Sequence, residues 1–226
     1  MNDPLISLRQ VAKSYKMVRR TLEVLRGVDL DIARGEFLAL RGSSGAGKST
    51  LLHLIGGLDS PNTGEILFEG QNVARYSERA LAHFRNRRVG FVFQAYHLLP
   101  ELNALENVCL PARIGRVPVG DAEKRGHELL DQVGLSERVE HKPYELSGGE
   151  QQRVAIARSL IAQPELVLAD EPTGNLDSHT GGEIIELLKG LCVQRNTTLV
   201  IATHDAKVAT SAQRLVELVD GRIAGS

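Results

Sequence analysis

A glycine-rich segment that ends in lysine and serine is the part of the sequence best suited to bind phosphate. Residues 42–49 read Gly-Ser-Ser-Gly-Ala-Gly-Lys-Ser and match the pattern G-x-x-x-x-G-K-[ST]. The glycines let the backbone wrap so that successive N–H groups point inward at phosphate oxygens. Lys48 can then reach the β- and γ-phosphates of a nucleotide, and the Ser49 hydroxyl can ligate Mg²⁺. The residues expected to contact the nucleotide are Gly42, Ser43, Ser44, Gly45, Ala46, Gly47, Lys48, Ser49 and Thr50.

Two adjacent carboxylates form a second candidate for chemistry. Asp170 and Glu171 follow the apolar run 166–169 and precede Pro172. At the tip of a strand, Asp170 is suited to hold Mg²⁺ directly or through water. Glu171 can polarise a water aimed at the γ-phosphate. Acidic pairs are also common in ordinary loops. A catalytic role for this pair is therefore indicated only in combination with the phosphate loop in the same chain.

The elements that must position these residues alternate along the chain. Short apolar runs cover residues 37–40, 166–169 and 199–202. Helix-like stretches cover residues 48–55, 151–162 and 182–191. Runs that are apolar on both faces favour buried parallel strands, although periodicity alone leaves buried helix segments open. The alternation predicts an α/β fold with a parallel central sheet.

The remaining segments differ from this pattern. Partial alternation marks residues 5–8, 28–32, 65–68 and 214–219, with turn signals at Glu69-Gly70 and Asp220-Gly221. We expect antiparallel strands and hairpins there, at the margins of the core. From about Leu98 to Leu146 there is no strong strand signal, and residues 121–133 fit a helix. This stretch is interpreted as a helical subdomain inserted into the core.

Composition bounds the function classes. The chain has 226 residues, of which 42% are hydrophobic, which is enough for a substantial core. A net charge of -1, from 27 basic and 28 acidic residues, argues against nucleic acid as a partner. The two cysteines, Cys109 and Cys192, lack metal-ligand spacing and are expected to be reduced thiols. We expect neither a signal peptide nor a transmembrane segment, so any membrane role requires a separate membrane subunit.

Residues 146–153 read Leu-Ser-Gly-Gly-Glu-Gln-Gln-Arg, and here the sequence resembles the ATP-binding cassette (ABC) family through its signature motif. Ser147, Gly148 and Gly149 begin a helix-like run and offer further N–H groups to an anion. The resemblance implies that they contact the γ-phosphate of ATP held by the opposite subunit. Two chains in a head-to-tail homodimer would then complete two sites.

Further positions match family motifs, and the resemblance implies their roles. Gln94 matches the Q-loop, which senses Mg²⁺ and the attacking water. Asp177 ends the D-loop, which crosses the dimer interface, although Gly174-Asn175 departs from the commonest form. His204 matches the histidine that contacts the γ-phosphate. Tyr15 matches the aromatic ring that stacks on adenine.

The resemblance covers essentially the whole chain and implies its organisation. Residues 1–226 form one ABC nucleotide-binding domain. About 1–94 and 147–226 make a P-loop NTPase (RecA-like) core with a parallel sheet and an N-terminal antiparallel β-subdomain. About 95–146 make an inserted α-helical subdomain that leads into the signature helix. The cofactors would be ATP and Mg²⁺.

The branch of the family is indicated by three stretches. Residues 97–108 and 168–177 resemble the LolD/MacB branch of bacterial cassettes, and residues 49–59 are most similar to its lipoprotein-releasing ATPases. This implies a peripheral location on the cytoplasmic face of the inner membrane, integral permease partners of LolC/LolE or MacB type, and lipoprotein release. The branch also contains MacB-type and YbbA-type export ATPases and the division-linked, regulatory FtsE type, which share the catalytic parts.

Two other classes fit the sequence poorly. Chromosome and DNA-repair ATPases with a similar signature split the core with a long coiled coil, and this chain has no sustained heptads. A P-loop kinase of small molecules would need an acceptor-binding lid and no signature motif.

Overall fold

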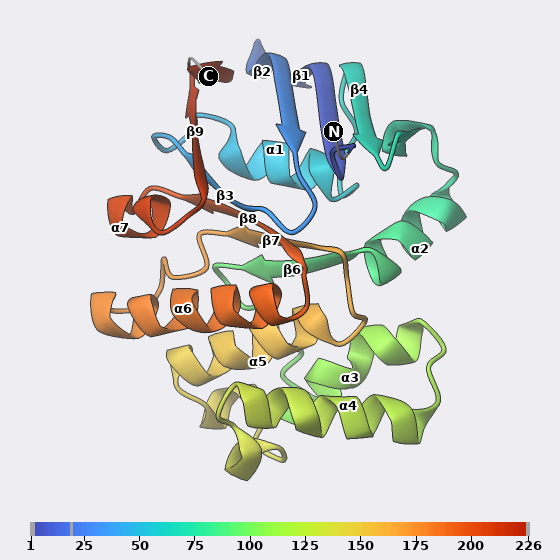
Figure 1. Cartoon of the computed structure of the whole chain (residues 1–226), viewed down its shortest axis with the longest axis vertical. Coiled ribbons are helices and arrows are strands. Elements are labelled where there is room, and N and C mark those ends of the chain that lie inside the picture. Colours follow the sequence, from blue (N-terminus) through green and yellow to red (C-terminus); the bar gives the residue numbers. More distant parts are fainter. Residues whose placement is uncertain (1–2, 19, 225–226) are drawn as a thin grey trace. The chain divides into compact units, whose positions relative to one another are not determined.

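The computed structural model describes residues 3–18 and 20–224, and these fall into two compact units (Figure 1). The first unit combines the chain up to Arg85 with the chain from Thr198 onward. The second unit is Asn86–Thr197. The sequence analysis places the boundaries of an inserted subdomain at about 95 and 146, which are different positions, and that subdivision stays a prediction.

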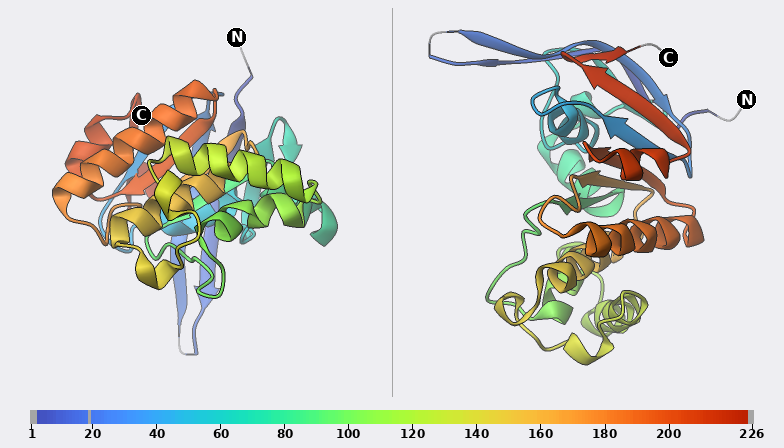
Figure 2. Two further views of the ribbon diagram at one scale, coloured as in Figure 1. Left: turned by 90° about the horizontal axis from the view of Figure 1, so that it is seen from below. Right: turned by 90° about the vertical axis from the view of Figure 1, so that its left-hand side faces the viewer.

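The first unit contains a four-stranded antiparallel sheet in the order β2-β1-β4-β5. Its strands are β1 (Ile6–Lys16), β2 (Thr21–Ile32), β4 (Thr63–Phe68) and β5 (Gln71–Asn72). Figure 2 shows β1 and β2 as a long two-stranded ribbon. Val28, Leu30 and Ile32 are buried and alternate with exposed neighbours, so one face of β2 packs on the core. The antiparallel strands expected at residues 5–8, 28–32 and 65–68 are confirmed.

Parallel strands form the second sheet segment of this unit. β3 (Phe37–Arg41) lies between β8 (Thr198–Thr203) and β9 (Arg214–Val219) and is parallel to both. Phe37–Leu40 and the whole of β8 are buried, which confirms that these apolar runs are core strands. The unit also contains α1 (Lys48–Ile55), α7 (Ala206–Thr210), the 3₁₀ turn Val73–Arg75 and most of α2 (Glu78–Arg87). Helix α1 lies against β8.

One expectation needs a correction. Residues 214–219 were expected to be an antiparallel strand, but β9 pairs in parallel with β3 and in antiparallel only with β10 (Arg222–Ala224). The physical reason is that α7 lies between β8 and β9 in the chain. Like other crossover connections, it returns the chain to the edge of the sheet where β8 begins, so β9 runs in the same direction as β8 and β3. The Asp220-Gly221 turn then reverses the chain into β10 as expected.

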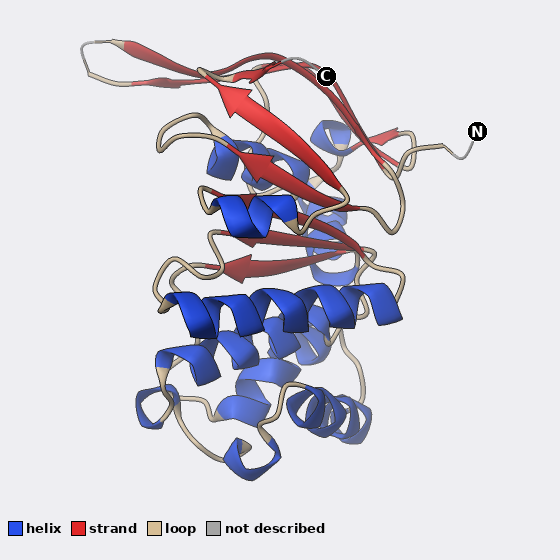
Figure 3. Cartoon of the chain, turned by 60° about the vertical axis from the view of Figure 1, so that its left-hand side comes forward, coloured by secondary structure: helices blue, strands red, loops and turns tan. Residues whose placement is uncertain are grey.

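The second unit pairs two parallel strands with four α-helices (Figure 3). The strands are β6 (Val89–Phe93) and β7 (Leu166–Asp170). The helices are α3 (Ala104–Ile114), α4 (Val119–Gln132), α5 (Gly148–Leu160) and α6 (Ser178–Gln194), with 3₁₀ turns at Ser136–Arg138 and Pro143–Glu145. The described residues 98–146 contain no strand, as expected.

Helices α5 and α6 begin earlier than their apolar patterns predict, because polar residues cap both. Ser147 and Glu150 form a capping box at the start of α5. Asp177 accepts hydrogen bonds from the backbone N–H groups of His179 and Thr180 at the start of α6. Each helix therefore starts directly at a residue that the sequence analysis assigned to the nucleotide site.

The two cysteines are free and buried. Burial raises the pKa of the Cys109 thiol to about 11 and that of Cys192 to about 12. Both cysteines are thus core residues without a disulfide partner.

None of the helices formed by residues 3–18 and 20–224 is both long enough and apolar enough to span a bilayer.

Candidate nucleotide site

The glycine-rich loop connects β3 directly to α1 and packs too tightly to accept side chains at two positions. A Cβ atom at Gly42 would lie 2.4 Å from the carbonyl oxygen of Leu218. Gly47 has a φ of 105° and its Cβ would lie 2.9 Å from Cδ2 of Leu25. Glycine is therefore required at both ends of the loop, because a side chain would collide and Gly47 also needs left-handed backbone.

Lys48 begins α1 and folds back over this loop. Its Nζ donates to the carbonyl oxygens of Gly42, at 2.9 Å, and Ser43, at 3.2 Å. The side chain is almost fully buried, which holds a positive charge inside the curve of the loop. No side chain caps the start of α1, and its first turn carries no acidic residue. The positive end of the helix dipole at this start therefore favours an anion.

The sheet places His204 at the same edge as this loop. Arg41, the last residue of β3, is paired with Thr203, the last residue of β8. His204 follows Thr203 and is exposed. Ligands of open α/β sheets bind outside the carboxyl ends of the strands, so the loop and His204 occupy the expected position in this unit.

Tyr15 lies near the end of β1 with its ring partly exposed. Its hydroxyl donates to Asp59, which also receives the ammonium of Lys13. Lys13 lies with Nζ 5.0 Å from the centre of the Tyr15 ring. A tyrosine held in this way is suited to stack on a base. Neither Asp59 nor Lys13 was identified from the sequence.

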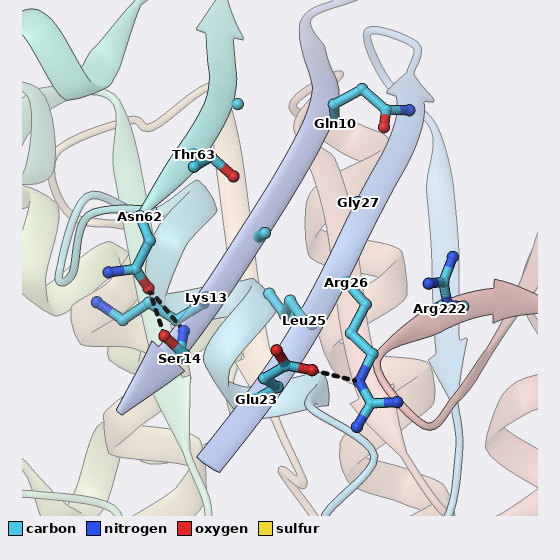
Figure 4. A pocket seen from close by; sticks show the side chains of 12 residues that line it. Gln10, Lys13, Ser14, Glu23, Leu25, Arg26, Gly27, Asn62, Thr63 and Arg222 are labelled. Carbon is cyan, nitrogen blue, oxygen red and sulfur yellow. Dashed lines mark hydrogen bonds and ion pairs between the residues drawn. The ribbon is translucent and has the colours of Figure 1, made fainter. Parts of the chain in front are cut away.

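The structure also contains a pocket of about 640 Å³ on the antiparallel sheet (Figure 4). Its wall includes Lys13, Ser14 and Asn62, where Asn62 Oδ1 accepts from the backbone N–H of Ser14 at 2.6 Å. Across the pocket, Glu23 pairs with Arg26 at 3.5 Å. None of the residues assigned to the nucleotide site from the sequence lines this pocket.

In the second unit, two aligned strand ends bring Gln94 and the acidic pair together. Phe93, the last residue of β6, is paired with Asp170, the last residue of β7. Gln94 and Glu171 follow these two positions, and Glu171 has left-handed backbone with φ 46°. The Gln94 side chain donates one hydrogen bond to the Asn175 side chain. Gln94, Asp170 and Glu171 are thus neighbours within one unit.

The signature segment is built as a helix start with small residues. Ser147 Oγ accepts from the backbone N–H of Glu150 at 3.3 Å, and a carboxylate oxygen of Glu150 accepts from the N–H of Ser147 at 2.8 Å. The hydrogen bond from the Ser147 backbone is the main cause that lowers the pKa of Glu150. A Cβ at Gly148 would meet the Tyr96 hydroxyl at 3.0 Å, and one at Gly149 would meet Thr180 at 2.9 Å.

Asp177 uses its carboxylate within its own helix. The hydrogen bonds from Thr180 are the largest cause of its lowered pKa, and His179 adds a further bond from its N–H. Its expected role at a dimer interface stays a prediction. The structure adds a capping role for Asp177 at the start of α6. In the sequence, this role could have been predicted from an aspartate shortly before a helix-like apolar run.

The oxygen donors expected to hold a metal are the Ser49 hydroxyl, the Gln94 carboxamide and the Asp170 carboxylate. Within residues 3–18 and 20–224, no group of three or more His, Cys, Asp or Glu side chains could hold a metal ion alone. Mg²⁺ usually takes one or two protein ligands and fills its shell with phosphate oxygens and water. Each of these oxygen donors is, within its own unit, of a kind that a nucleotide-bound magnesium ion takes.

Comparison with known proteins places the chain among ABC proteins. The family model described as "ABC transporter" matches residues 25–174. The Lipoprotein-releasing system ATP-binding protein LolD of Geobacter metallireducens is 52% identical, with 97% of each chain covered. The protein of the same name from Bacteroides fragilis is 51% identical over 97% of this chain and all of its own.

Solved structures agree. A dimeric bacterial ABC transporter cassette has a TM-score of 0.90 at 43% identity, with 97% of both chains covered. A dimeric post-hydrolysis state of an ATP-binding cassette, bound to ADP and phosphate, has a TM-score of 0.90 at 42% identity and the same coverage. The model match, these identities and this fold agree with the phosphate loop and signature helix described above, and the chain belongs to the ABC transporter family as an ATP-binding, ATP-hydrolysing cassette.

Proposed function

We propose that this chain is the ATPase subunit of a bacterial transporter that releases lipoproteins from the inner membrane. The observation that carries the proposal is 52% identity over 97% of both chains with an ATP-binding protein of a lipoprotein-releasing system. Relatives of the same name from several bacterial groups match at similar identity, for example one from Myxococcus xanthus at 49%. Coverage of 97% of this chain means that the relationship extends beyond the shared motifs.

The residues of the first unit bind the nucleotide in this proposal. The loop 42–47 and the start of α1 donate N–H groups to the phosphates, and Lys48 moves its ammonium from the loop carbonyls to phosphate oxygens. Tyr15 stacks on adenine. His204 contacts the γ-phosphate from the end of β8. Bound Mg²⁺ would neutralise phosphate charge, with Ser49 as one protein ligand.

The second unit supplies the residues that act on water and the metal. Asp170 and Gln94 offer oxygen ligands to Mg²⁺. Glu171 accepts a hydrogen bond from the attacking water and orients it. The unit also carries Ser147, Gly148 and Gly149 at the start of α5. We propose that these three contact the γ-phosphate bound by a second copy of the chain, so that each site of a homodimer is completed by its partner.

Besides a second copy of the chain, the proposed function requires a separate membrane subunit as a partner. We propose that integral permeases of LolC/LolE type hold the cassette on the cytoplasmic face of the inner membrane. The inserted helical subdomain, about 95–146, would receive the contact through the segment after Gln94. Closure of the dimer on ATP would then pull on the permease, and hydrolysis would release it.

The test is reconstitution with the membrane subunits encoded beside this chain. The complex is placed in vesicles that carry a fluorescent lipoprotein, and release to an acceptor is measured with and without ATP. We expect ATP-dependent release that is lost in Lys48→Ala, because this variant lacks the phosphate-binding ammonium. ATP hydrolysis without lipoprotein release would reject the cargo, and co-purification with a division protein instead would favour a regulatory role.

A further inference from the structure

Gln94 and Asn175 face each other through their amide groups, although they are 81 positions apart. Nε2 of Gln94 donates to Oδ1 of Asn175 at 3.1 Å. Nδ2 of Asn175 donates to the main-chain oxygen of Gln94 at 2.9 Å. Both residues belong to the unit Asn86–Thr197. Asn175 is one of the two positions where the D-loop departs from the commonest form.

This pair of hydrogen bonds fixes which atom of Gln94 faces outward. The main-chain oxygen of Gln94 can only accept, so the Asn175 atom that faces it must be the NH₂ group. Oδ1 of Asn175 is then the acceptor for the Gln94 side chain, which must present Nε2 to it. A carboxamide is planar, with oxygen and nitrogen on opposite sides. The Oε1 atom of Gln94 is therefore turned away from Asn175.

Gly174 provides the room for this contact. A Cβ atom at position 174 would lie 2.6 Å from Nε2 of Gln94 and 2.8 Å from its Cδ. Gly174 does not have positive φ, so its backbone conformation is open to other residues. The close approach of the Gln94 side chain thus explains glycine at this position. The two departures from the commonest D-loop act on the same carboxamide.

We propose that Asn175 and Gly174 are positioning residues that present Oε1 of Gln94, instead of its NH₂ group, to Mg²⁺ and the attacking water. This inference rests on the metal role of Gln94 in the proposed function. Oxygen is the ligand atom that Mg²⁺ takes, and an NH₂ group cannot replace it. Gln94 and Asn175 are exposed, so water competes with their hydrogen bonds and the expected effect is moderate, about two- to tenfold.

The first readout is spectroscopic and needs no turnover. In ¹⁵N-labelled protein with the homodimer intact, the side-chain NH₂ signals of Gln94 are assigned by their loss in Gln94→Ala. We expect these two proton signals to be shifted apart in the wild type and to move to free-amide positions in Asn175→Ala and Gly174→Ala. Asn72→Ala and Gly190→Ala are matched controls. Asn72 also donates and accepts one hydrogen bond each, and a Cβ at Gly190 would meet nothing within 4 Å.

The second readout is the Mg²⁺ concentration that gives half-maximal ATPase activity, measured beside the ATP dissociation constant in EDTA. Asn175→Ala and Gly174→Ala are each expected to raise the half-saturating Mg²⁺ about two- to tenfold, with ATP affinity in EDTA unchanged. Neither should add to the effect of Gln94→Ala, because all three act on one group.

Two results would overturn the inference even if the metal role of Gln94 is correct. One is a Gln94 amide signal that is the same in wild type and Asn175→Ala. The other is a normal Mg²⁺ requirement in Asn175→Ala while Gln94→Ala raises it. If Gln94→Ala itself leaves the Mg²⁺ requirement unchanged, the metal role of Gln94 is wrong and the inference falls with it. Lipoprotein release, tested by Lys48→Ala, is decided separately.

Discussion

The hydroxyl of Tyr15 donates a hydrogen bond to Oδ2 of Asp59 at 2.8 Å, and this contact holds the edge of the ring that we expect to stack on adenine. Oδ1 of the same carboxylate receives the Lys13 ammonium at 2.6 Å. Lys13 lies over the ring and is almost fully buried. The ring is thus fixed at its edge by Asp59 and on one face by Lys13, while 39% of Tyr15 stays exposed for a ligand.

This arrangement predicts a graded loss of ATP affinity in variants of Tyr15. Tyr15→Ala removes the stacking surface, worth about 1–3 kcal/mol per base, and should raise the ATP dissociation constant about fivefold to a hundredfold. Tyr15→Phe keeps the ring but frees its edge, so a rise of about two- to fivefold is expected. Equilibrium binding of a fluorescent ATP analogue measures both. Wild-type affinity in Tyr15→Phe would contradict the role of the hydroxyl, and equal losses in the two variants would contradict the stacking of the ring.

Asp59→Asn should raise the ATP dissociation constant about as much as Tyr15→Phe does. It weakens the contacts of Asp59 with Lys13 and with the Tyr15 hydroxyl, while both of those side chains remain unchanged. The matched control is Asp31→Asn. Asp31 forms a 2.7 Å ion pair with Arg9 on the same antiparallel sheet, and its replacement should leave ATP affinity unchanged. A loss of affinity in Asp31→Asn as large as in Asp59→Asn would assign the effect to general stability.

Acid stability offers an independent check on Asp59. Burial acts to raise the pKa of its carboxyl, but hydrogen bonds from Lys13, Tyr15 and the Ser60 N–H outweigh burial and hold the pKa below the usual 3.8. Such a carboxyl stabilises the fold above its unfolded pKa, and this contribution is lost as the pH falls through the folded pKa. Urea unfolding should show Asp59→Asn less stable than wild type at pH 6, by up to about 1 kcal/mol. The difference should shrink below about pH 4, and a constant difference from pH 6 to pH 3 would be the contrary result.

Local sequence patterns were sufficient to predict much of the fold. The run 48–55 matches α1 residue for residue, because the phosphate loop fixes its start and Gly56-Gly57 its end. The buried runs at 37–40 and 199–202 became core strands since nothing polar interrupts either face. The direction of β9 could not be predicted, because it depends on a five-residue helix, α7, whose pattern is too short to recognise.

The contacts that orient the site residues lay outside what the sequence could predict. Tyr15 and Asp59 are 44 positions apart, and Gln94 and Asn175 are 81 apart. No periodic pattern links such pairs, since only the folded sheet brings them together. Motif spacing predicts the residues that carry chemistry, and the structure adds the contacts that hold two of them, Tyr15 and Gln94, in position.

Replacement of Glu171 by glutamine should separate ATP binding from hydrolysis. The amide keeps the shape of the side chain but is a poor proton acceptor, so turnover should fall by about two to four orders of magnitude. ATP affinity should remain, and the variant should accumulate as a nucleotide-bound dimer in light scattering. Glu186→Gln on α6, which removes only an exposed contact with Lys189, is the control and should turn over normally. Near-normal turnover in Glu171→Gln would exclude the proposed role of this residue.

Mixed dimers test whether each site draws on two chains. A Lys48→Ala homodimer lacks the phosphate lysine in both sites, and a Ser147→Arg homodimer lacks the signature contact in both. A heterodimer of the two combines Lys48 of one chain with Ser147 of the other in one intact site. We expect the heterodimer, purified through two different tags, to hydrolyse ATP at about half the wild-type rate if the sites act independently.

The Ser147 variant needs its own control, because Ser147 also caps α5. Loss of the cap alone costs about 1 kcal/mol of stability, and Ser147→Ala makes that loss without adding bulk. If Ser147→Ala homodimers keep substantial activity while Ser147→Arg homodimers do not, the arginine acts by obstructing the phosphate contact. A heterodimer as inactive as both parents, with its fold intact by circular dichroism, would mean that each chain completes its site alone. The signature helix would then belong to the same chain's nucleotide, and the proposed dimer would be wrong.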